Sequence, residues 1–163
     1  MAVSTVLKHF TDGTITLEDG TGTPVTLTVP FSQGDFSISG LQESQKAVSV
    51  YQSRGVLHSL RKGEKTFVTG SFSAMLADVS DSSAGNLLDF VRKTNAYSGN
   101  TSTSGSGDVY TIKVTLTIEG TDLGDSADHT IVLDDCACTA DVSEGEPDSI
   151  SISFTSYADP VMT

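Results

Sequence analysis

Few side chains in this sequence have the types and spacings that catalysis requires. The three histidines are His9, His58 and His129, and none stands in a catalytic or metal-ligating motif. His58 lies between apolar residues of an expected strand, which is typical of a structural histidine rather than a general base. The glycines beside Ser104 and Ser106 have neither the spacing nor the strand-to-helix turn of a nucleophile elbow. No constellation meets the geometric requirements of an active site, so we predict that the protein is not an enzyme.

Two groups of residues carry metal-binding atoms, but neither completes a known ligand set. Cys136 and Cys138 form a C-x-C motif without the second half of a zinc site. A disulfide at this spacing would be strained, so we interpret both as free thiols and small core residues in a reducing compartment. Asp122, Asp125 and Asp128 do not have the spacing of an EF-hand loop and are expected in a solvated turn. We therefore expect no metal and no cofactor.

The distribution of charge is more informative than its total. The net charge is −12, and residues 108–163 contain twelve acids but only one base. Five of the nine basic residues fall between Lys46 and Lys65. An acidic chain repels nucleic-acid phosphate, which disfavours ordinary nucleic-acid binding. Acid excess can serve solubility alone, but the separation of opposite charges also suits a head-to-tail contact between copies of the chain.

Four of these bases are candidate inter-subunit contact residues: Arg54, Arg61, Lys62 and Lys65. One interpretation is a solvated turn region, because exposed ion pairs contribute little. The other is contact with acids of a neighbouring subunit. The sequence leaves both interpretations open.

The elements expected around these residues are mostly strands. At 163 residues the chain suits a single domain, 1–163, and its apolar runs are rich in Val, Ile and Thr. Alternation of apolar and polar residues predicts strands, with a bulge at Asp134–Asp135 and either a bulge or a close backbone approach at Gly70. The predicted strands span residues 14–17, 25–29, 35–39, 48–51, 56–60, 66–79, 109–118, 130–142 and 150–154.

One helix is expected among these strands. Apolar residues at helical spacing predict it near 87–93, with N-cap oxygens offered by Asp81, Ser82 and Ser83. A turn is predicted at 61–64 and a polar loop at 99–107. Together these elements predict a mainly β fold, an antiparallel β-sandwich with one flanking α-helix.

The ends and apolar runs of the sequence contain no targeting pattern. The first ten residues lack the long apolar run and cleavage site of a signal peptide. No stretch approaches the length of a membrane span. We therefore expect no contact with a membrane.

Three regions follow one another in a definite order along the chain: a hydrophobic-turn-basic pattern, a single helix followed by a Gly/Ser/Thr loop, and a C-terminal pair of strands. These regions comprise residues 48–55, 60–64, 71–76, 87–93, 131–136, 143–148 and 151–156. By the order of these regions, the whole chain resembles the major tail tube proteins of long-tailed, siphovirus-type bacteriophages. Inner tube proteins of contractile tails and tube proteins of type VI secretion are similar in architecture.

This resemblance implies a structural role in the virion tail, in a particle assembled in the cytoplasm of a bacterial host. Six copies would form a ring with an inner β-barrel around a channel, and the rings would stack into the tail tube. Implied partners are further copies of the chain, the tape measure protein, the tail terminator and distal tail proteins, and double-stranded DNA that passes transiently during ejection. Acids of the last third are candidates to line the channel, with strand tips and the outer surface as equally open positions for them.

A second class of function also fits the strands and the Ser/Thr content. The chain could be a β-sandwich binding module that recognises a glycan or a protein on a phage or cell surface. This alternative does not account for the basic cluster set against an acidic end. It is also weakened by the absence of Trp, since aromatic side chains form most carbohydrate platforms.

Overall fold

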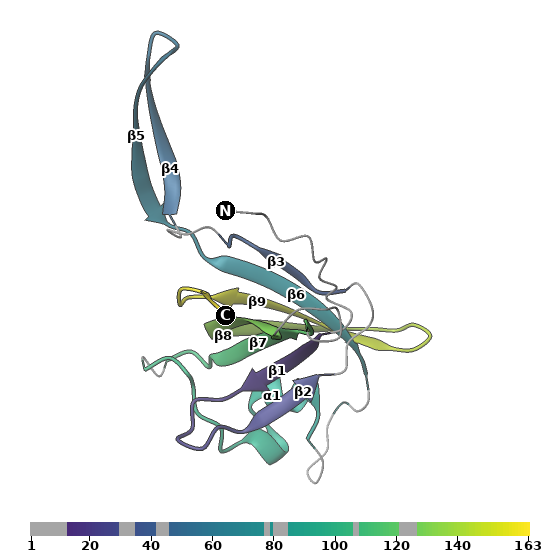
Figure 1. Cartoon of the computed structure of the whole chain (residues 1–163). Helices are drawn as coiled ribbons and strands as arrows, with labels where there is room; N and C mark the ends of the chain where they lie inside the picture. Colours follow the sequence, from purple (N-terminus) through teal and green to yellow (C-terminus); the bar gives the residue numbers. More distant parts are fainter. Residues whose placement is uncertain are drawn as a thin grey trace.

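The computed structural model describes residues 13–29, 35–41, 46–76, 79, 85–105, 108–120 and 127–163. Within these ranges the chain is mainly antiparallel β structure with one short α-helix, as predicted (Figure 1). The strands are β1 Thr14–Glu18, β2 Thr26–Val29, β3 Ser37–Ser39, β4 Lys46–Ser53, β5 Val56–Lys65, β6 Val68–Met75, β7 Ile112–Ile118, β8 His129–Ser143, β9 Ser149–Ser156 and β10 Val161–Met162. The helices are α1 Leu87–Arg92 and the short 3₁₀ helix η2 Asn95–Tyr97.

Eight of the strands belong to one hydrogen-bonded sheet. Its order is β2-β1-β7-β8-β9-β6-β3, with β10 paired to β8. This refines the predicted architecture, because one twisted sheet supplies the strands that we expected to divide between two. Within the described residues β2 and β3 each pair on one side only, so the sheet has two edges and does not close into a barrel. The remaining strands, β4 and β5, pair with each other in a separate two-stranded sheet.

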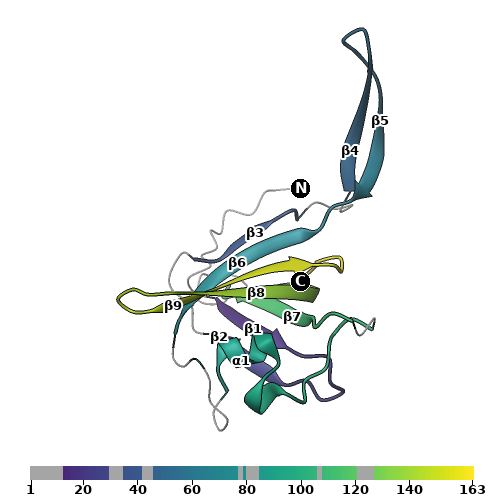
Figure 2. The ribbon, with the colours of Figure 1, turned by 180° about the vertical axis from the view of Figure 1, so that it is seen from behind.

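The core lies on one face of the large sheet, where α1 and η2 cover it (Figure 2). β7 shows the predicted alternation, and its four buried side chains are Ile112, Val114, Leu116 and Ile118. The helices contribute Phe90 and Tyr97, whose rings meet edge to face with centroids 4.9 Å apart. Burial of this face is the dominant stabilising contribution, since each fully buried large apolar side chain contributes roughly 1.5–3 kcal/mol.

The predicted bulge in β8 is confirmed. Ile112 pairs with Cys136 while Val114 pairs with Leu133, so β8 carries one more residue than β7 between these pairs. Asp135 has a φ of 50° at this point. The extra residue changes the parity of β8, and as a result both Leu133 and Cys136 are buried on the same face.

Of the two interpretations of Gly70, the structure shows the close backbone approach and not a bulge, since β6 pairs with β9 in unbroken register there. A Cβ atom built on Gly70 would lie 2.4 Å from Cζ of Phe154 and 2.6 Å from the carbonyl oxygen of Ser37. β6 runs between β9 and β3 at this position. Only a residue without a side chain allows the Phe154 ring to cross there.

The structure differs from two local predictions, the turn at 61–64 and the N-cap of the helix. The turn predicted at 61–64 is wrong, because these residues continue β5, where Arg61 pairs with Ser49 and Lys62 with Val48. The predicted helix is present, but its N-cap is Asn86, which accepts a 2.8 Å hydrogen bond from the Asp89 amide. The proposed caps at 81–83 lie outside the described residues.

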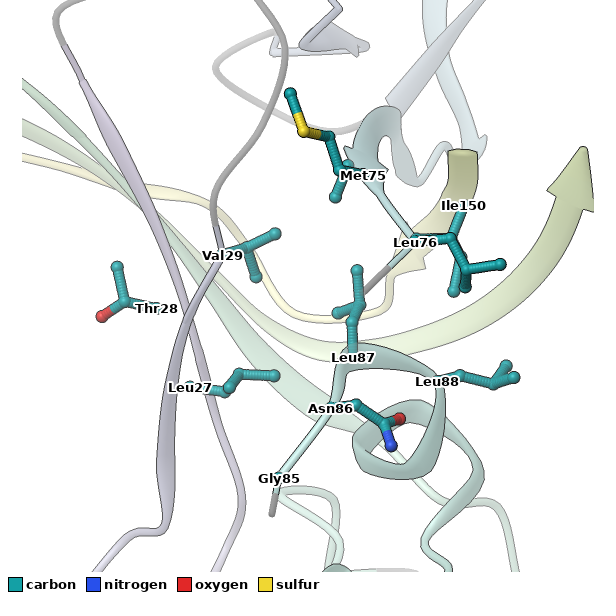
Figure 3. Close-up of a pocket in the computed structure, with 11 residues that line it drawn as sticks. Leu27, Thr28, Val29, Met75, Leu76, Gly85, Asn86, Leu87, Leu88 and Ile150 are labelled. Carbon is teal, nitrogen blue, oxygen red and sulfur yellow. The ribbon is translucent and has the colours of Figure 1, made fainter. Parts of the chain in front are cut away.

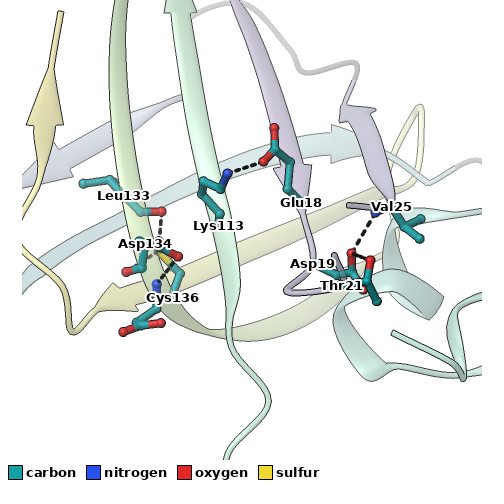
Figure 4. A network of polar contacts seen from close by, with 9 residues as sticks. Glu18, Asp19, Thr21, Val25, Lys113, Leu133, Asp134 and Cys136 are labelled. Carbon is teal, nitrogen blue, oxygen red and sulfur yellow. Dashed lines mark hydrogen bonds and ion pairs between the residues drawn. The ribbon is translucent and has the colours of Figure 1, made fainter. Parts of the chain in front are cut away.

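The loop after η2 is fixed to the turn between β1 and β2 through Asp19. The Asp19 carboxylate accepts hydrogen bonds from the amides of Val25 and Thr101 and from the Thr21 hydroxyl, at 2.7, 3.0 and 2.9 Å (Figure 4). Burial by itself would raise the pKa of Asp19, but these hydrogen bonds together hold it below its usual value. The loop is therefore anchored by a buried carboxylate.

Candidate self-assembly surface

The two-stranded sheet projects from the body of the protein as an arm, defined here as residues 46–65 (Figure 1). Arg54 and Gly55 form its tip, with φ values of 50° and 80°. Two consecutive positive φ angles are the signature of a type I′ turn, whose twist matches that of a β-hairpin. A two-stranded hairpin alone is only marginally stable in water. An arm of this kind is therefore stabilised when another surface packs against it.

One face of the arm is apolar and exposed. Residues that pair directly across an antiparallel ladder share a face. Val50 pairs with Leu60, and the neighbouring pairs on that face are Val48 with Lys62 and Gln52 with Leu57. The exposed fractions of Val48, Val50, Leu57 and Leu60 are 64%, 53%, 55% and 60%. Contiguous exposed apolar side chains of this kind mark interaction surfaces.

The arm is also the basic part of an acidic molecule. It holds five bases and one acid, a net charge of +4, whereas the remaining residues hold four bases and twenty acids, a net charge of −16. All four candidate contact residues lie on it. Arg54 is at the tip, and the Arg61 guanidinium lies over the Tyr51 ring at 5.5 Å. His58 is on the arm as well, and its side chain is exposed.

Lys65 has a different environment from the other three bases. Its ammonium lies 2.9 Å from the Asp159 carboxylate and donates a 3.3 Å hydrogen bond to the Tyr157 carbonyl. Both partners follow β9 in the same chain. Lys65 therefore connects the base of the arm to the body, whereas Arg54, Arg61 and Lys62 extend along the arm.

Sequence reasoning found the bases of the arm but missed its apolar face. The alternation of Val48 and Val50 predicted a strand with one buried side, and nothing in the local pattern distinguishes a side buried within the chain from one left uncovered. The sequence feature that could have indicated exposure is the high density of bases beside these apolar residues. Lys and Arg are rarely fully buried, so a strand rich in them tends to be exposed to solvent.

The face of the large sheet opposite the core is covered by hydroxyl groups. Rows of cross-strand partners run over β3, β6, β9 and β8, and Ser37 and Ser71 lie 3.0 Å apart within one of them, oxygen to oxygen. Two of these rows are Ser37-Ser71-Ser153-Thr139 and Ser39-Thr69-Thr155-Ala137. Farther along the same face, Lys113 of β7 forms an ion pair with Glu18 of β1 (Figure 4). Glu144 and Glu146, two of the acids of the last third, lie in the turn between β8 and β9.

The hydroxyl face contains a shallow hollow of about 380 Å³ between β3, β6, β9 and β8. Its described lining is Ser and Thr with Ala137, Gly70 and Phe154. The ring of Phe154 belongs to the buried core, so within this lining no exposed aromatic ring is present on which a sugar could stack. The hollow therefore gives little support to the glycan-binding alternative.

The cysteines do not form a reactive or ligating site. Cys136 is buried and Cys138 half-buried, and both thiols are free. Burial raises the pKa of Cys136 to about 12 and raises that of Cys138 as well. Since the thiolate is the form that binds metals and attacks electrophiles, both groups are unreactive near neutral pH.

No metal cluster is found in the part of the chain that the structure describes, where no three His, Cys, Asp or Glu side chains come close enough to hold an ion. Asp128 accepts a hydrogen bond from the Gly120 amide at 3.1 Å. Asp122 and Asp125 lie outside the described residues, as does His9. Among the helices described, none has the length and apolar character needed to cross a membrane.

Comparison with known proteins identifies the fold through structure alone. No family model matches the sequence, and no curated protein matches it. The structure is similar to a chain of the PVC extracellular contractile injection system, from the sheath–tube complex in its extended state. The two share 11% sequence identity and a TM-score of 0.57, over 99% of each chain.

Two further similar chains come from related assemblies. One belongs to the sheath/tube terminator of the same PVC system, with 13% identity and a TM-score of 0.54 over 93% of this chain and 92% of that one. The other belongs to the anti-feeding prophage cap, a tube-terminating cap, with 11% identity and a TM-score of 0.55 over 100% and 94%. The fold of this chain is thus one found in phage-tail-like contractile injection systems.

Proposed function

We propose that this protein is a structural subunit that self-assembles into stacked rings of a phage tail tube. The observation that carries the proposal is the arm, which combines an exposed apolar face with a charge of +4, whereas the rest of the chain has a charge of −16. A basic surface of this kind is complementary in charge to the acidic remainder of another copy of the same molecule. The similarity of the fold to chains of sheath–tube, terminator and cap assemblies supports the same conclusion.

The two sheet edges supply a second mode of association. Within the described residues β2 and β3 each pair on one side only, and open strand edges in a monomer are a liability for aggregation. Pairing of one copy's β2 edge with the next copy's β3 edge would extend the sheet around a ring, which we propose to be hexameric. Closure removes both edges. The arm, which belongs to neither edge, is then available for contacts between rings.

The hydroxyl face is the surface that we assign to the channel wall in this assembly. The described residues that line its hollow are mostly Ser and Thr, and none of them is a base that would hold DNA phosphates. Passage of double-stranded DNA during ejection is therefore compatible with this wall, and the tape measure, terminator and distal tail proteins are the partners that the proposal implies. We keep the long-tailed siphovirus type as the proposed source, although the similar structures come from contractile systems.

Electron microscopy of the purified chain tests this function. We expect rings or hollow tubes in negative stain and a sedimenting fraction in ultracentrifugation. Replacement of Arg61 and Lys62 by Glu should leave the monomer folded but impair stacking, because it reverses two exposed charges of the arm. A control variant with Arg92→Glu and Lys93→Glu makes the same charge change outside the arm and should still form tubes. A wild-type chain that remains a monomer and binds a glycan or an unrelated protein would reject the tube proposal.

A further inference from the structure

An apolar groove opens at the end of the large sheet, between β2, β6, β9 and α1 (Figure 3). Its volume is about 220 Å³, and its lining includes Leu27, Val29, Met75, Leu76, Leu87 and Ile150. Small-molecule pockets usually have volumes of about 300–1,000 Å³ and enclose their ligand. This groove is smaller than that, and its rim residue Met75 is 60% exposed, so side chains of another protein fit it better than a free ligand does.

An acidic turn borders the groove. The turn between β8 and β9 carries Glu144, Glu146 and Asp148, all exposed. Its position beside the groove is fixed by a 2.9 Å hydrogen bond from the Leu76 amide to the Asp148 carbonyl. Ile150, two residues after Asp148, lines the groove directly. The surface at this end of the sheet is therefore apolar with an acidic border.

The arm and the groove lie at opposite ends of the same strands. β6 begins at Val68, three residues after the arm ends, and finishes at Met75 on the rim of the groove. β9 runs antiparallel beside it, with Ser156 opposite Val68 and Ser149 opposite Met75. In Figure 1 the arm and the β8–β9 turn accordingly leave the sheet at opposite ends.

We infer that the groove and its acidic turn receive the arm of the next copy of this chain. The inference rests on the proposed function and names the surface through which successive copies join. The arm offers an apolar face and bases, and the groove offers an apolar lining and acids. Because the two surfaces stand at opposite ends of the subunit, their contact is heterologous and propagates along an axis instead of closing a dimer.

Charge reversal on both sides tests this pairing. The arm variant carries Arg61→Glu and Lys62→Glu, and the turn variant carries Glu144→Lys and Glu146→Lys. Each variant by itself places like charges at the contact and should lower the sedimenting fraction about tenfold or more. An equal mixture should assemble again, because each variant's arm then meets a turn of opposite charge on the other variant.

The mixture distinguishes this inference from the proposed function. If wild-type chains form tubes but the mixture of variants does not, the arm binds some other surface and the inference is wrong. If wild-type chains do not assemble at all, the proposed function has failed. A fold defect in either single variant would show in circular dichroism before mixing, and recovery of assembly on mixing is not expected from a misfolded chain.

A disulfide cross-link tests the groove directly and does not depend on charge. A variant with Leu60→Cys on the arm and Met75→Cys at the groove rim should give, on mild oxidation of assembled protein, a ladder of covalent multimers in a denaturing gel. The control combines Leu60→Cys with Val161→Cys, which is 55% exposed but lies outside the groove, and it should give no extended ladder. Equal ladders from both, or none from the first despite visible tubes, would overturn the assignment.

Discussion

The arm and the large sheet are built from the same kind of sequence but have opposite environments. In β7 alternating apolar residues are buried to 7% exposure or less, whereas in the arm Val48, Val50 and Leu60 are more than half exposed. Both patterns are period-two alternations with hydroxyl or basic residues between the apolar ones. The difference is that α1 and η2 pack on β7 as a second layer of structure, whereas no described helix packs on the arm. Alternation thus predicts that a strand has one apolar face. It does not predict whether that face is buried by the same chain or by another molecule.

The largest effect that tests this comparison is expected in the body. Phe72 is 1% exposed and its ring packs against Phe154, with centroids 6.4 Å apart. Phe72→Ala removes this buried ring and leaves a cavity, so it should lower the free energy of unfolding by about 3–5 kcal/mol. Urea denaturation of the monomer, followed by circular dichroism, measures the loss. A change below about 1 kcal/mol would mean that the sheet does not hold the core described above.

A smaller loss is expected from Gly70→Ala. The added methyl group would meet the Phe154 ring and the Ser37 carbonyl, and overpacking of this kind costs about 1–3 kcal/mol. Gly22→Ala is the matched control, because a Cβ there meets nothing within 4 Å. The difference between the two midpoints of denaturation gives the cost of the close approach. Equal midpoints would contradict the packing of β6 between β3 and β9.

Asp19→Asn should have a moderate effect that depends on pH. The pKa of Asp19 is lowered in the folded state, so its ionised form stabilises the fold above the unfolded pKa of about 3.9, and this contribution is lost as the pH falls through the folded value. We expect the variant to be less stable by about 1–2 kcal/mol at pH 7. The difference should shrink below pH 4, as measured by denaturation at several pH values. A pH-independent difference would assign the loss to packing instead of charge.

The smallest effect on monomer stability is expected in the arm. Val50→Ser with Leu60→Ser replaces side chains that are 53% and 60% exposed, so the free energy of unfolding should change by about 0.5 kcal/mol or less. The same variant should nevertheless assemble poorly, because the apolar contact between copies is removed. Denaturation of the monomer and sedimentation of the assembly measure the two effects separately. A large loss of monomer stability would show that the arm is packed within its own chain.

Much of the fold followed from local pattern. The strands of the core, the bulge at Asp134–Asp135 and the special role of Gly70 were readable because burial on one face imposes strict alternation. The extent of β5 was not, since Arg61, Lys62 and Gly63 have the composition of a turn. Their extended conformation is set by pairing with Val48 and Ser49, which composition alone does not reveal.

The candidate contact surface was predicted in part. Its bases were visible from their clustering, but Lys65 could not be separated from Arg61 and Lys62, because its Asp159 partner lies 94 positions farther along the chain. The groove is composed of residues from β2, β6, α1 and β9. Such a surface depends on how distant segments come together, which single-sequence periodicity does not report.

The position of β9 in the sheet determines the stage of synthesis at which the sheet and the groove can be completed. β9 is inserted between β6 and β8, although it is synthesised after both of them. Until residues 149–156 leave the ribosome, β6 lacks its long partner and the groove lacks Ile150. Sheets that depend on contacts between distant segments also form slowly. A nascent chain therefore contains its arm well before its groove is complete, so in the proposed assembly growth would begin only from chains in which β9 has been synthesised and has folded.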